Sequence, residues 1–163
     1  MSHMGKPELL NYFTENGIDF DTVEHPEVFT VEAMMPHVKH LPGAVCKNLF
    51  LKDKQKNFYL LSAKFDRDIK LSEVGKAVGA KDLRFGDENV MFELLGIKQG
   101  AVTAYALVND RQKRVKFLVD KQLVDGSHEA VCFHPLVNTA TTKISSKDFN
   151  KFLYLTKHEV RQF

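Results

Sequence analysis

The chain has 163 residues with 44% apolar content, enough for one sizeable core and too short for two ordinary domains without a clear linker. Its 23 basic and 21 acidic side chains leave a formal net charge of +2, so the composition excludes a strongly basic nucleic-acid binder, and any RNA-binding surface must be local. The only two cysteines, Cys46 and Cys132, form no CxxC pattern, which argues against a zinc cluster or a disulfide scaffold and predicts two buried, reduced thiols.

Hydrophobic periodicity and turn residues predict helices and strands in alternation along the chain. Apolar residues at spacings of three and four indicate helices, and short β-prone runs indicate strands. In the first half of the chain we expect a helix over residues 7–16, a strand over 20–24, a helix capped by Thr30 and ending at Met35, and a hairpin of strands 48–51 and 58–61. A helix over 72–78 and a helix from Asp87 to the stop at Gly96 are expected next. The chain is then expected to form a second hairpin of strands 102–108 and 115–119, a strand over 130–133 and a closing helix.

Local signals sharpen two of these boundaries. Pro36 and the Leu41-Pro42-Gly43 turn favour a loop after the second helix, and such a loop is a natural place for a site. Ser145 and Asp148 match a capping box, so the chain is expected to close with an amphipathic helix.

The order of elements places the chain in the mixed α/β (α+β) class. Helices and strands are interspersed without a strict βαβ rhythm, which favours a mixed sheet with helices packed around it. We expect one domain over residues 5–163, with residues 1–4 resembling a cloning remnant. No apolar run approaches the ~18 residues of a membrane span and no signal peptide is evident, so we expect a soluble, cytoplasmic monomer with no membrane partner.

Familiar catalytic signatures are absent from the sequence, including GxSxG, GxxxxGK[ST], HExxH and GxGxxG. His37 and His40 are spaced to share a helical face and could bind a metal. However, the neighbouring prolines make a continuous helix doubtful there, and no third ligand is obvious. We therefore expect no metal and no organic cofactor.

Four segments carry a resemblance to a known family: HPEVFTV at residues 25–31, GAVCKNLFL at 43–51, GAVTA at 100–104 and FHPLVNTAT at 133–141. In this order they resemble the YbaK/prolyl-tRNA synthetase-associated domain family, and most closely its freestanding members that hydrolyse alanine mischarged onto proline tRNA. The similarity runs from about Leu9 to Thr156. It implies a mixed, partly barrel-like sheet surrounded by helices. It also implies a trans-acting deacylase for Ala-tRNA(Pro) that can contact prolyl-tRNA synthetase transiently.

Lys47 and His134 are the catalytic residues that the resemblance implies. The matching family lysine faces the editing pocket and engages the tRNA 3′ end, whereas without the motif Lys47 would be interpreted as a surface lysine at a strand edge. His134 precedes Pro135 at a strand end and is expected to position the substrate or orient a water; a structural histidine is the alternative. Asn48 offers an amide beside Lys47, although strand alternation directs neighbouring side chains to opposite faces.

Three further segments are expected to bind the substrate. The resemblance implies that Phe29, Thr30 and Val31 shape a pocket sized for a methyl group. The backbone of Gly100, Ala101, Val102 and Thr103 is expected to bind the aminoacyl group, with Ala104 standing where the family's GxxxP loop has proline. Asn138 and Thr139 can bond loop backbone or the terminal adenosine.

A prolyl synthetase site cannot strongly reject alanine, because lost apolar contact gives only ~1 to 3 kcal/mol of discrimination. The resemblance therefore implies a second sieve that admits alanine and excludes proline, with the tRNA 2′-hydroxyl helping to activate water. Two alternatives stay open. One is the same reaction on serine, cysteine or 2-aminobutyrate, and the other is a non-catalytic module that binds tRNA or a synthetase.

Overall fold

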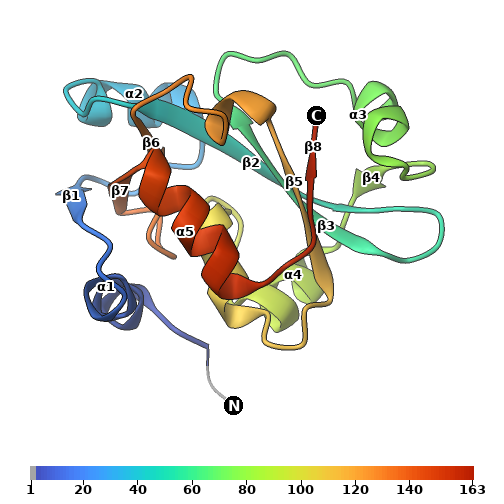
Figure 1. Ribbon diagram of the computed structural model, residues 1–163, viewed down its shortest axis with the longest axis horizontal. Coiled ribbons are helices and arrows are strands. Elements are labelled where there is room, and N and C mark those ends of the chain that lie inside the picture. Colours follow the sequence, from blue (N-terminus) through green and yellow to red (C-terminus); the bar gives the residue numbers. More distant parts are fainter. Residues whose placement is uncertain (1–2) are drawn as a thin grey trace.

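A computed structural model describes residues 3–163, and residues 1–2 lie outside that range. Figure 1 shows a mixed sheet of eight strands with helices around it. The helices are α1 (Lys6–Glu15), α2 (Val31–Val38), α3 (Leu71–Val78), α4 (Glu88–Leu95) and α5 (Ser146–Thr156), with the 3-10 helices η1 (Ala104–Asn109) and η2 (Lys121–Leu123). The strands are β1 (Phe20–Glu24), β2 (Ala44–Lys52), β3 (Phe58–Lys64), β4 (Arg84–Phe85), β5 (Val115–Val119), β6 (Ala130–Phe133), β7 (Ala140–Ser145) and β8 (Val160–Gln162).

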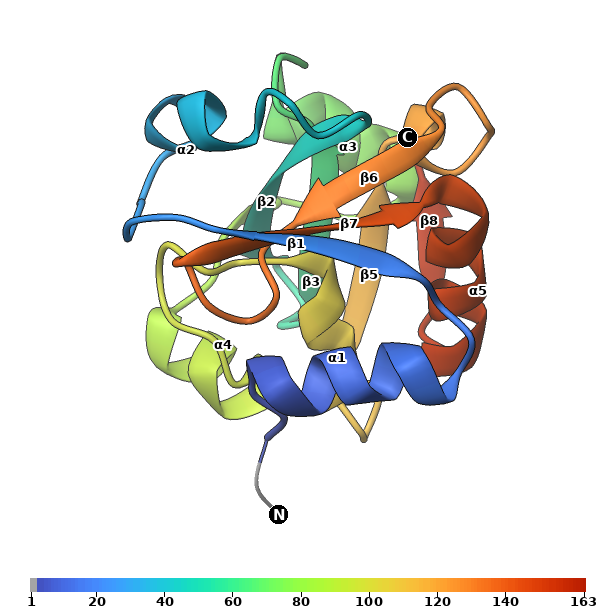
Figure 2. The ribbon, with the colours of Figure 1, turned by 90° about the vertical axis from the view of Figure 1, so that its left-hand side faces the viewer.

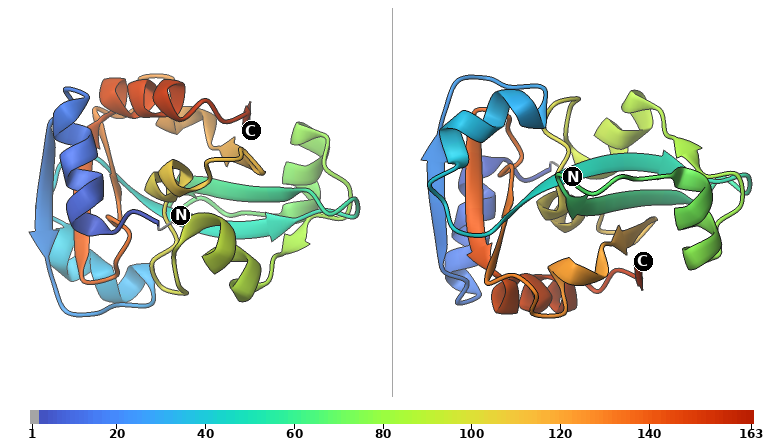
Figure 3. Two further views of the ribbon diagram at one scale, coloured as in Figure 1. Left: turned by 90° about the horizontal axis from the view of Figure 1, so that it is seen from below. Right: turned by 90° about the horizontal axis from the view of Figure 1, so that it is seen from above.

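The sheet follows the order β1-β7-β6-β2-β3-β5-β8, and β4 pairs with β2 beside this path. The pairs β2–β6, β3–β5 and β5–β8 are parallel, whereas β1–β7, β6–β7, β2–β3 and β2–β4 are antiparallel. In Figures 2 and 3 the sheet bends at β2, so that β1, β7 and β6 form one wall and the long β2–β3 hairpin extends away from it. The predicted mixed sheet and the first hairpin are confirmed.

An aromatic core lies where α1, α5, β6 and η1 meet. Phe13 of α1, Phe152 of α5 and Phe133 of β6 meet around Tyr105, with ring centroids 5.1 to 5.8 Å from that residue. Each fully buried side chain of this size stabilises the fold by roughly 1.5–3 kcal/mol. The Tyr105 hydroxyl donates a hydrogen bond to the carbonyl of Thr142 at 2.9 Å, which ties the core to β7. Cys46 and Cys132 are free and buried, as predicted.

The predicted second hairpin is wrong. Residues 104–109 form the 3-10 helix η1, which begins where the hydroxyl of Thr103 accepts a hydrogen bond from the amide of Tyr105 at 3.2 Å. A short, continuously apolar run is compatible with either a buried strand or a buried helical turn, so periodicity could not distinguish them. The remaining half, β5, pairs instead with β3 and β8.

Two other boundaries are corrected. Thr30 caps α2 as predicted, accepting a hydrogen bond from the amide of Ala33 at 3.1 Å, but the helix continues through Pro36 to Val38. Ser145 caps α5 as predicted, yet the chain does not close with that helix, because β8 follows and pairs with β5. In both places the packing of the segment on its neighbours outweighs the local signal. The strands β4, β7 and β8 were not expected from the sequence.

Of the expected remnant at residues 1–4, the first two lie outside the described residues. The amide of Met4 donates a hydrogen bond to Asn109 at 2.7 Å, and its side chain packs against the core. Within residues 3–163, no helix combines the length and apolar character that crossing a membrane requires.

Candidate functional site

The candidate site lies at a gap in the sheet. On one edge, β2 pairs with β6 through Ala44 and Val45, and with β4 through Leu51 and Lys52. Between these two pairings a pocket of about 310 Å³ meets the strand. It is lined by Phe29, Thr30, Val31, Met34, Cys46, Lys47, Asn48, Leu49, Gln99, Gly100, Val102 and His134. Segments that are far apart in the sequence thus converge beside the stretch of β2 that lies between its pairings with β6 and β4.

Most of the predicted site residues line this pocket: Phe29, Thr30, Val31, Lys47, Asn48, Gly100, Val102 and His134. The other four do not line it. Ala101 and Thr103 are buried, and Thr103 caps η1. The side-chain amide of Asn138 donates to the carbonyl of Val28 at 2.8 Å, and the carbonyl of Thr139 accepts from the amide of His25 at 2.9 Å. Asn138 and Thr139 therefore hold the segment that leads into α2.

The surroundings of His134 fix its protonation. Its Nδ1 lies 2.8 Å from the carbonyl oxygen of Ala140, and because a carbonyl only accepts, Nδ1 carries the proton. Burial lowers the pKa of His134, the nearby His25 lowers it further, and the bond to Ala140 opposes both. The neutral ring therefore keeps Nε2 as a hydrogen-bond acceptor at neutral pH. Such an acceptor in the wall of a pocket can orient a water molecule.

Lys47 and Asn48 both line the pocket although they are neighbours on β2. Neighbouring strand residues point to opposite faces, but a pocket at the strand edge can be reached from both. The ammonium of Lys47 donates a hydrogen bond to the carbonyl oxygen of Arg67. The side-chain oxygen of Asn48 accepts one from the hydroxyl of Ser62 on β3. Both side chains are thus held by residues that do not themselves line the pocket.

Gly100 and Phe29 form one rim of the pocket. Gly100 has φ +90°, and a methyl group added there would lie 2.7 Å from Cδ1 of Phe29 and 3.1 Å from Nδ2 of Asn138. Only glycine fits this backbone at this distance from the ring without strain. Phe29 itself is 64% exposed. It therefore forms an outer rim, whereas Val31 and Met34, one helical turn apart on α2, form a wall.

Ala104 is the first residue of η1 and is fully buried. Thr103 before it is extended, with φ −158° and ψ 146°. Proline is compatible with the first position of a helix after an extended residue. The Thr103 cap holds the loop in this conformation even though the family's proline is absent.

Sequence reasoning did not identify Met34, Cys46, Leu49 and Gln99 as lining residues. Met34 could have been predicted from the sequence, because it lies three residues after Val31 and therefore on the same helical face. His25 was quoted only within a motif, yet its ring nitrogens lie 2.9 Å from the carbonyl of Pro26 and from the hydroxyl of Thr141. No group of three His, Cys, Asp or Glu residues suited to a metal ion occurs within residues 3–163.

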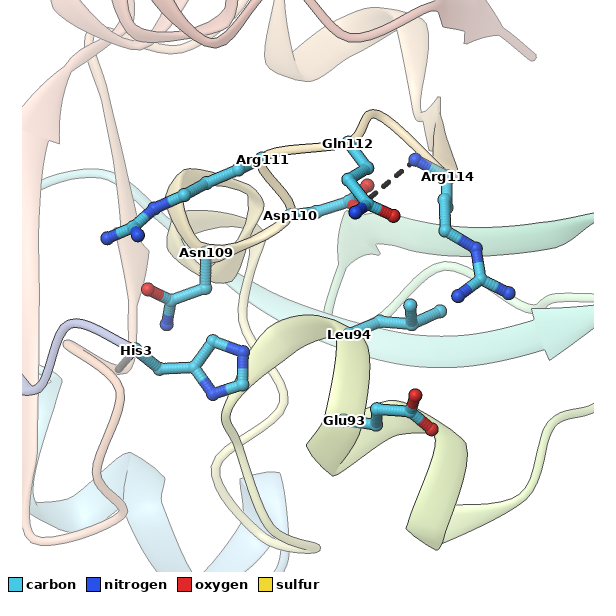
Figure 4. A pocket seen from close by; sticks show the side chains of 8 residues that line it. All are labelled: His3, Glu93, Leu94, Asn109, Asp110, Arg111, Gln112 and Arg114. Carbon is cyan, nitrogen blue, oxygen red and sulfur yellow. Dashed lines mark hydrogen bonds between the residues drawn. The ribbon is translucent and has the colours of Figure 1, made fainter. Parts of the chain in front are cut away.

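A second pocket, of about 240 Å³, lies between α4 and the loop after η1 (Figure 4). Its lining includes Asp110, which accepts hydrogen bonds from the amides of Arg114 and Val115 and from Nε2 of His158 at 3.0 Å. Burial alone would raise the pKa of Asp110, but the bonds from His158 and the two amides outweigh it, so the pKa lies below its ordinary value. This carboxylate fastens the start of β5 to the end of α5.

Comparison with known proteins places these features in a family. The aminoacyl-tRNA editing domain family matches residues 25–152. The chain is 49% identical over 142 residues to the mouse prolyl-tRNA synthetase associated domain-containing protein 1, covering 85% of this chain and 83% of the mouse protein. It is 32% identical over 149 residues to the prolyl-tRNA editing protein ProX of Acetoanaerobium sticklandii, covering 91% and 90%.

Solved structures agree with the sequence comparisons on the fold. A crystal structure of a protein proposed to be a trans-editing enzyme for prolyl tRNA synthetase superposes with a TM-score of 0.70 at 19% identity, covering 99% of this chain and 98% of that one. The matched family segment contains α2, the gap in β2, the Gly100 loop and His134. The chain therefore belongs to the aminoacyl-tRNA editing domain family.

Proposed function

We propose that this protein is a trans-acting aminoacyl-tRNA deacylase that hydrolyses the ester of alanine mischarged onto tRNA(Pro). The observation that carries the proposal is the convergence of Lys47, His134 and the Gly100 loop on one pocket at the gap in β2. Family membership supports the reaction class, and the names of the mouse and bacterial relatives point to prolyl tRNA. The substrate is the acceptor end of tRNA(Pro), and we expect the protein to act as a cytoplasmic monomer that contacts the synthetase only transiently.

The reaction needs little chemical machinery, because an aminoacyl ester is already an activated acyl group. A water adds to the ester carbonyl carbon, the bond from that carbon to the ribose oxygen breaks, and the water's proton passes to the leaving ribose oxygen. Nε2 of neutral His134 is free to accept a hydrogen bond from the water. The substrate's own 2′-hydroxyl assists in orienting that water. The backbone amides of Gly100 and Val102, the two residues of this loop that line the pocket, are assigned to the developing oxyanion.

Lys47 supplies the positive charge of the site. An ammonium holds a phosphate as a point charge, and holding the terminal phosphate positions the ester carbonyl beside the water. The bond to the Arg67 carbonyl uses one of the three ammonium donors, so two remain for the substrate. Asn48, fixed by Ser62, adds an amide next to this charge.

Selection for a small side chain is assigned to the α2 wall and the Gly100 loop. Val31 and Met34 face the loop across the pocket, while the exposed Phe29 covers Gly100 at the rim. Removing apolar wall atoms changes discrimination by about 1–3 kcal/mol per lost contact, which is the scale of one methylene. Truncating Val31 to alanine should therefore let larger amino acids be hydrolysed, and unchanged discrimination would remove Val31 from the sieve.

The decisive experiment is single-turnover deacylation of Ala-tRNA(Pro), with Pro-tRNA(Pro) and Ala-tRNA(Ala) as controls. Lys47→Ala is compared with Lys116→Ala. Lys116 is a lysine on β5, separated from β2 by β3, and it lies over the Tyr59 ring and outside the pocket lining. Loss of alanine from proline tRNA alone, strongly slowed but still measurable in Lys47→Ala and unchanged in Lys116→Ala, supports the proposal. Hydrolysis confined to serine, cysteine or 2-aminobutyrate esters would reassign the substrate. Salt-sensitive tRNA binding without any hydrolysis would instead indicate a binding module.

A further inference from the structure

The contact between Lys47 and Arg67 links the pocket to a turn outside it. Lys47 lies opposite Ala63 in the β2–β3 ladder, and β3 ends at Lys64. The chain then turns, with the amide of Arg67 bonded to the carbonyl of Lys64 at 3.0 Å. This turn presents the carbonyl oxygen of Arg67 to the ammonium of Lys47. The position of the ammonium therefore depends on where the turn holds that carbonyl.

The side chain of Arg67 fixes the turn. Its guanidinium lies 2.9 Å from the Oδ1 of Asp120, a carboxylate whose side chain is only 3% exposed. The same guanidinium lies 4.6 Å from the centroid of the Phe163 ring and 3.4 Å from the Phe163 carbonyl. A buried carboxylate and an aromatic face both favour arginine over any other cation.

Asp120 and Phe163 are themselves held by the sheet. The amide of Asp120 donates to the carbonyl of Ser62 on β3 at 2.9 Å. Phe163 continues β8, with its amide 3.1 Å from the carbonyl of Val119 and its carbonyl 3.0 Å from the amide of Lys121. The ends of three strands, β3, β5 and β8, therefore determine where the Arg67 turn lies.

We infer that Arg67, Asp120 and Phe163 are positioning residues that hold the ammonium of Lys47 at the edge of the pocket. The inference rests on the proposed function, in which Lys47 engages the substrate. A free lysine side chain samples many rotamers, and part of this conformational entropy must be lost each time a substrate is bound. An ammonium already tethered by one donor has lost it before the substrate arrives, which is preorganisation.

The test compares Asp120→Asn with Asp110→Asn. Both change a buried carboxylate beside β5 into an amide, but Asp110 lies at the far end of the strand and pairs with His158. Asp120→Asn removes the negative charge, so the ion pair to the Arg67 guanidinium is lost and at most a neutral hydrogen bond from the guanidinium to the amide oxygen remains. Phe163→Leu removes the aromatic face and keeps an apolar side chain. All variants are assayed at a temperature where circular dichroism shows them folded.

We expect Asp120→Asn to lower the single-turnover rate at saturating protein by roughly 10-fold, since small misplacement of a positioning group costs one to two orders of magnitude. Phe163→Leu should cause a smaller loss in the same direction, and Asp110→Asn none. In a Lys47→Ala background Asp120→Asn should have no further effect, because its influence passes through Lys47. An equal fractional loss in both backgrounds would overturn the inference and make Asp120 a structural residue.

A second readout does not depend on hydrolysis. The 13Cε and 15Nζ resonances of Lys47, assigned with Lys47→Arg, should move in Asp120→Asn and stay in place in Asp110→Asn. Unmoved Lys47 resonances in Asp120→Asn would overturn the inference even if activity fell. If the intact protein hydrolyses no mischarged tRNA, the proposed function fails while the resonances still decide whether the Arg67 turn holds Lys47.

Discussion

Two histidines show how the same side chain becomes a candidate catalytic group in one region and a structural one in another. His134 directly follows β6, donates from Nδ1 to a backbone carbonyl and keeps Nε2 as an acceptor in the pocket wall. His158 follows α5, is 7% exposed and directs Nε2 to the carboxylate of Asp110 at 3.0 Å. The Nδ1 of His158 is buried and has no partner within residues 3–163.

The main difference lies in the hydrogen-bond partner, although His158 is also the more buried of the two rings. A carbonyl partner carries no charge, and its hydrogen bond offsets only part of the cost of burying a charged imidazole at His134, so the pKa of His134 is lowered. A carboxylate partner holds the other ring in a buried pair that fastens two elements together. Removing groups from the Asp110 region should therefore change stability, whereas removing them from the His134 region should change turnover.

The largest expected effect is from Asp110→Ala. This change leaves His158 and the amides of Arg114 and Val115 buried without their acceptor, and breaking a buried pair costs about 3–5 kcal/mol. Urea denaturation should show this loss of unfolding free energy. The deacylation rate per folded molecule should stay unchanged. A fall in that rate while the protein remains folded would contradict the distinction between the two histidine regions, because it would mean that the Asp110 region contributes to turnover.

Next in size is the loss of turnover in His134→Asn. The asparagine amide can still donate to the carbonyl of Ala140, but it removes the acceptor at Nε2. We expect a single-turnover rate about 100-fold lower, the lower end of the usual contribution of a general base. The matched variant His158→Gln keeps a donor toward Asp110 and should retain full activity. Equal activity of both variants would show that the free Nε2 has no role.

A smaller effect is expected from Gly100→Ala. A methyl group on a backbone with φ +90° meets the Phe29 ring, and a left-handed conformation costs about 1–2 kcal/mol for a non-glycine residue. Thermal unfolding should show a loss of that size, accompanied by lower turnover. Adding Phe29→Ala removes the clash but leaves the φ strain, so the double variant should recover only part of the stability. Full recovery would mean that the backbone conformation itself costs nothing.

The smallest expected effect is a difference between the two regions in the pH at which each loses its function. The pKa of His134 is lowered from 6.5, so its neutral form, and with it turnover, should be lost as the pH falls below 6.5 through the folded-state value. The pKa of Asp110 is lowered from 3.8. Its stabilisation is therefore present above pH 3.8 and is lost as the pH falls through the still lower folded-state value. Rate profiles and circular dichroism over the same pH series should show activity falling before structure; simultaneous loss would contradict the assignment.

The site was more predictable from sequence than the sheet around it. The motifs at residues 25–31, 43–51, 100–104 and 133–141 contain most of the residues that line the pocket. Ala101 and Thr103 belong to those motifs yet do not line the pocket, because they pack inward beside η1. A motif marks a segment, whereas the direction of each side chain depends on what covers it.

Features set by neighbouring residues were determined by the sequence itself. The caps of Thr30 and Ser145, the stop at Gly96 and the β2–β3 hairpin follow from interactions within a few residues or across one short turn. Only the tertiary structure decided the parallel pairing of β5 with β3 and β8, the continuation of α2 through Pro36, and the contact of Lys47 with Arg67. These depend on partners brought together by the whole sheet, and local periodicity carries no information about which distant strand will satisfy a backbone edge.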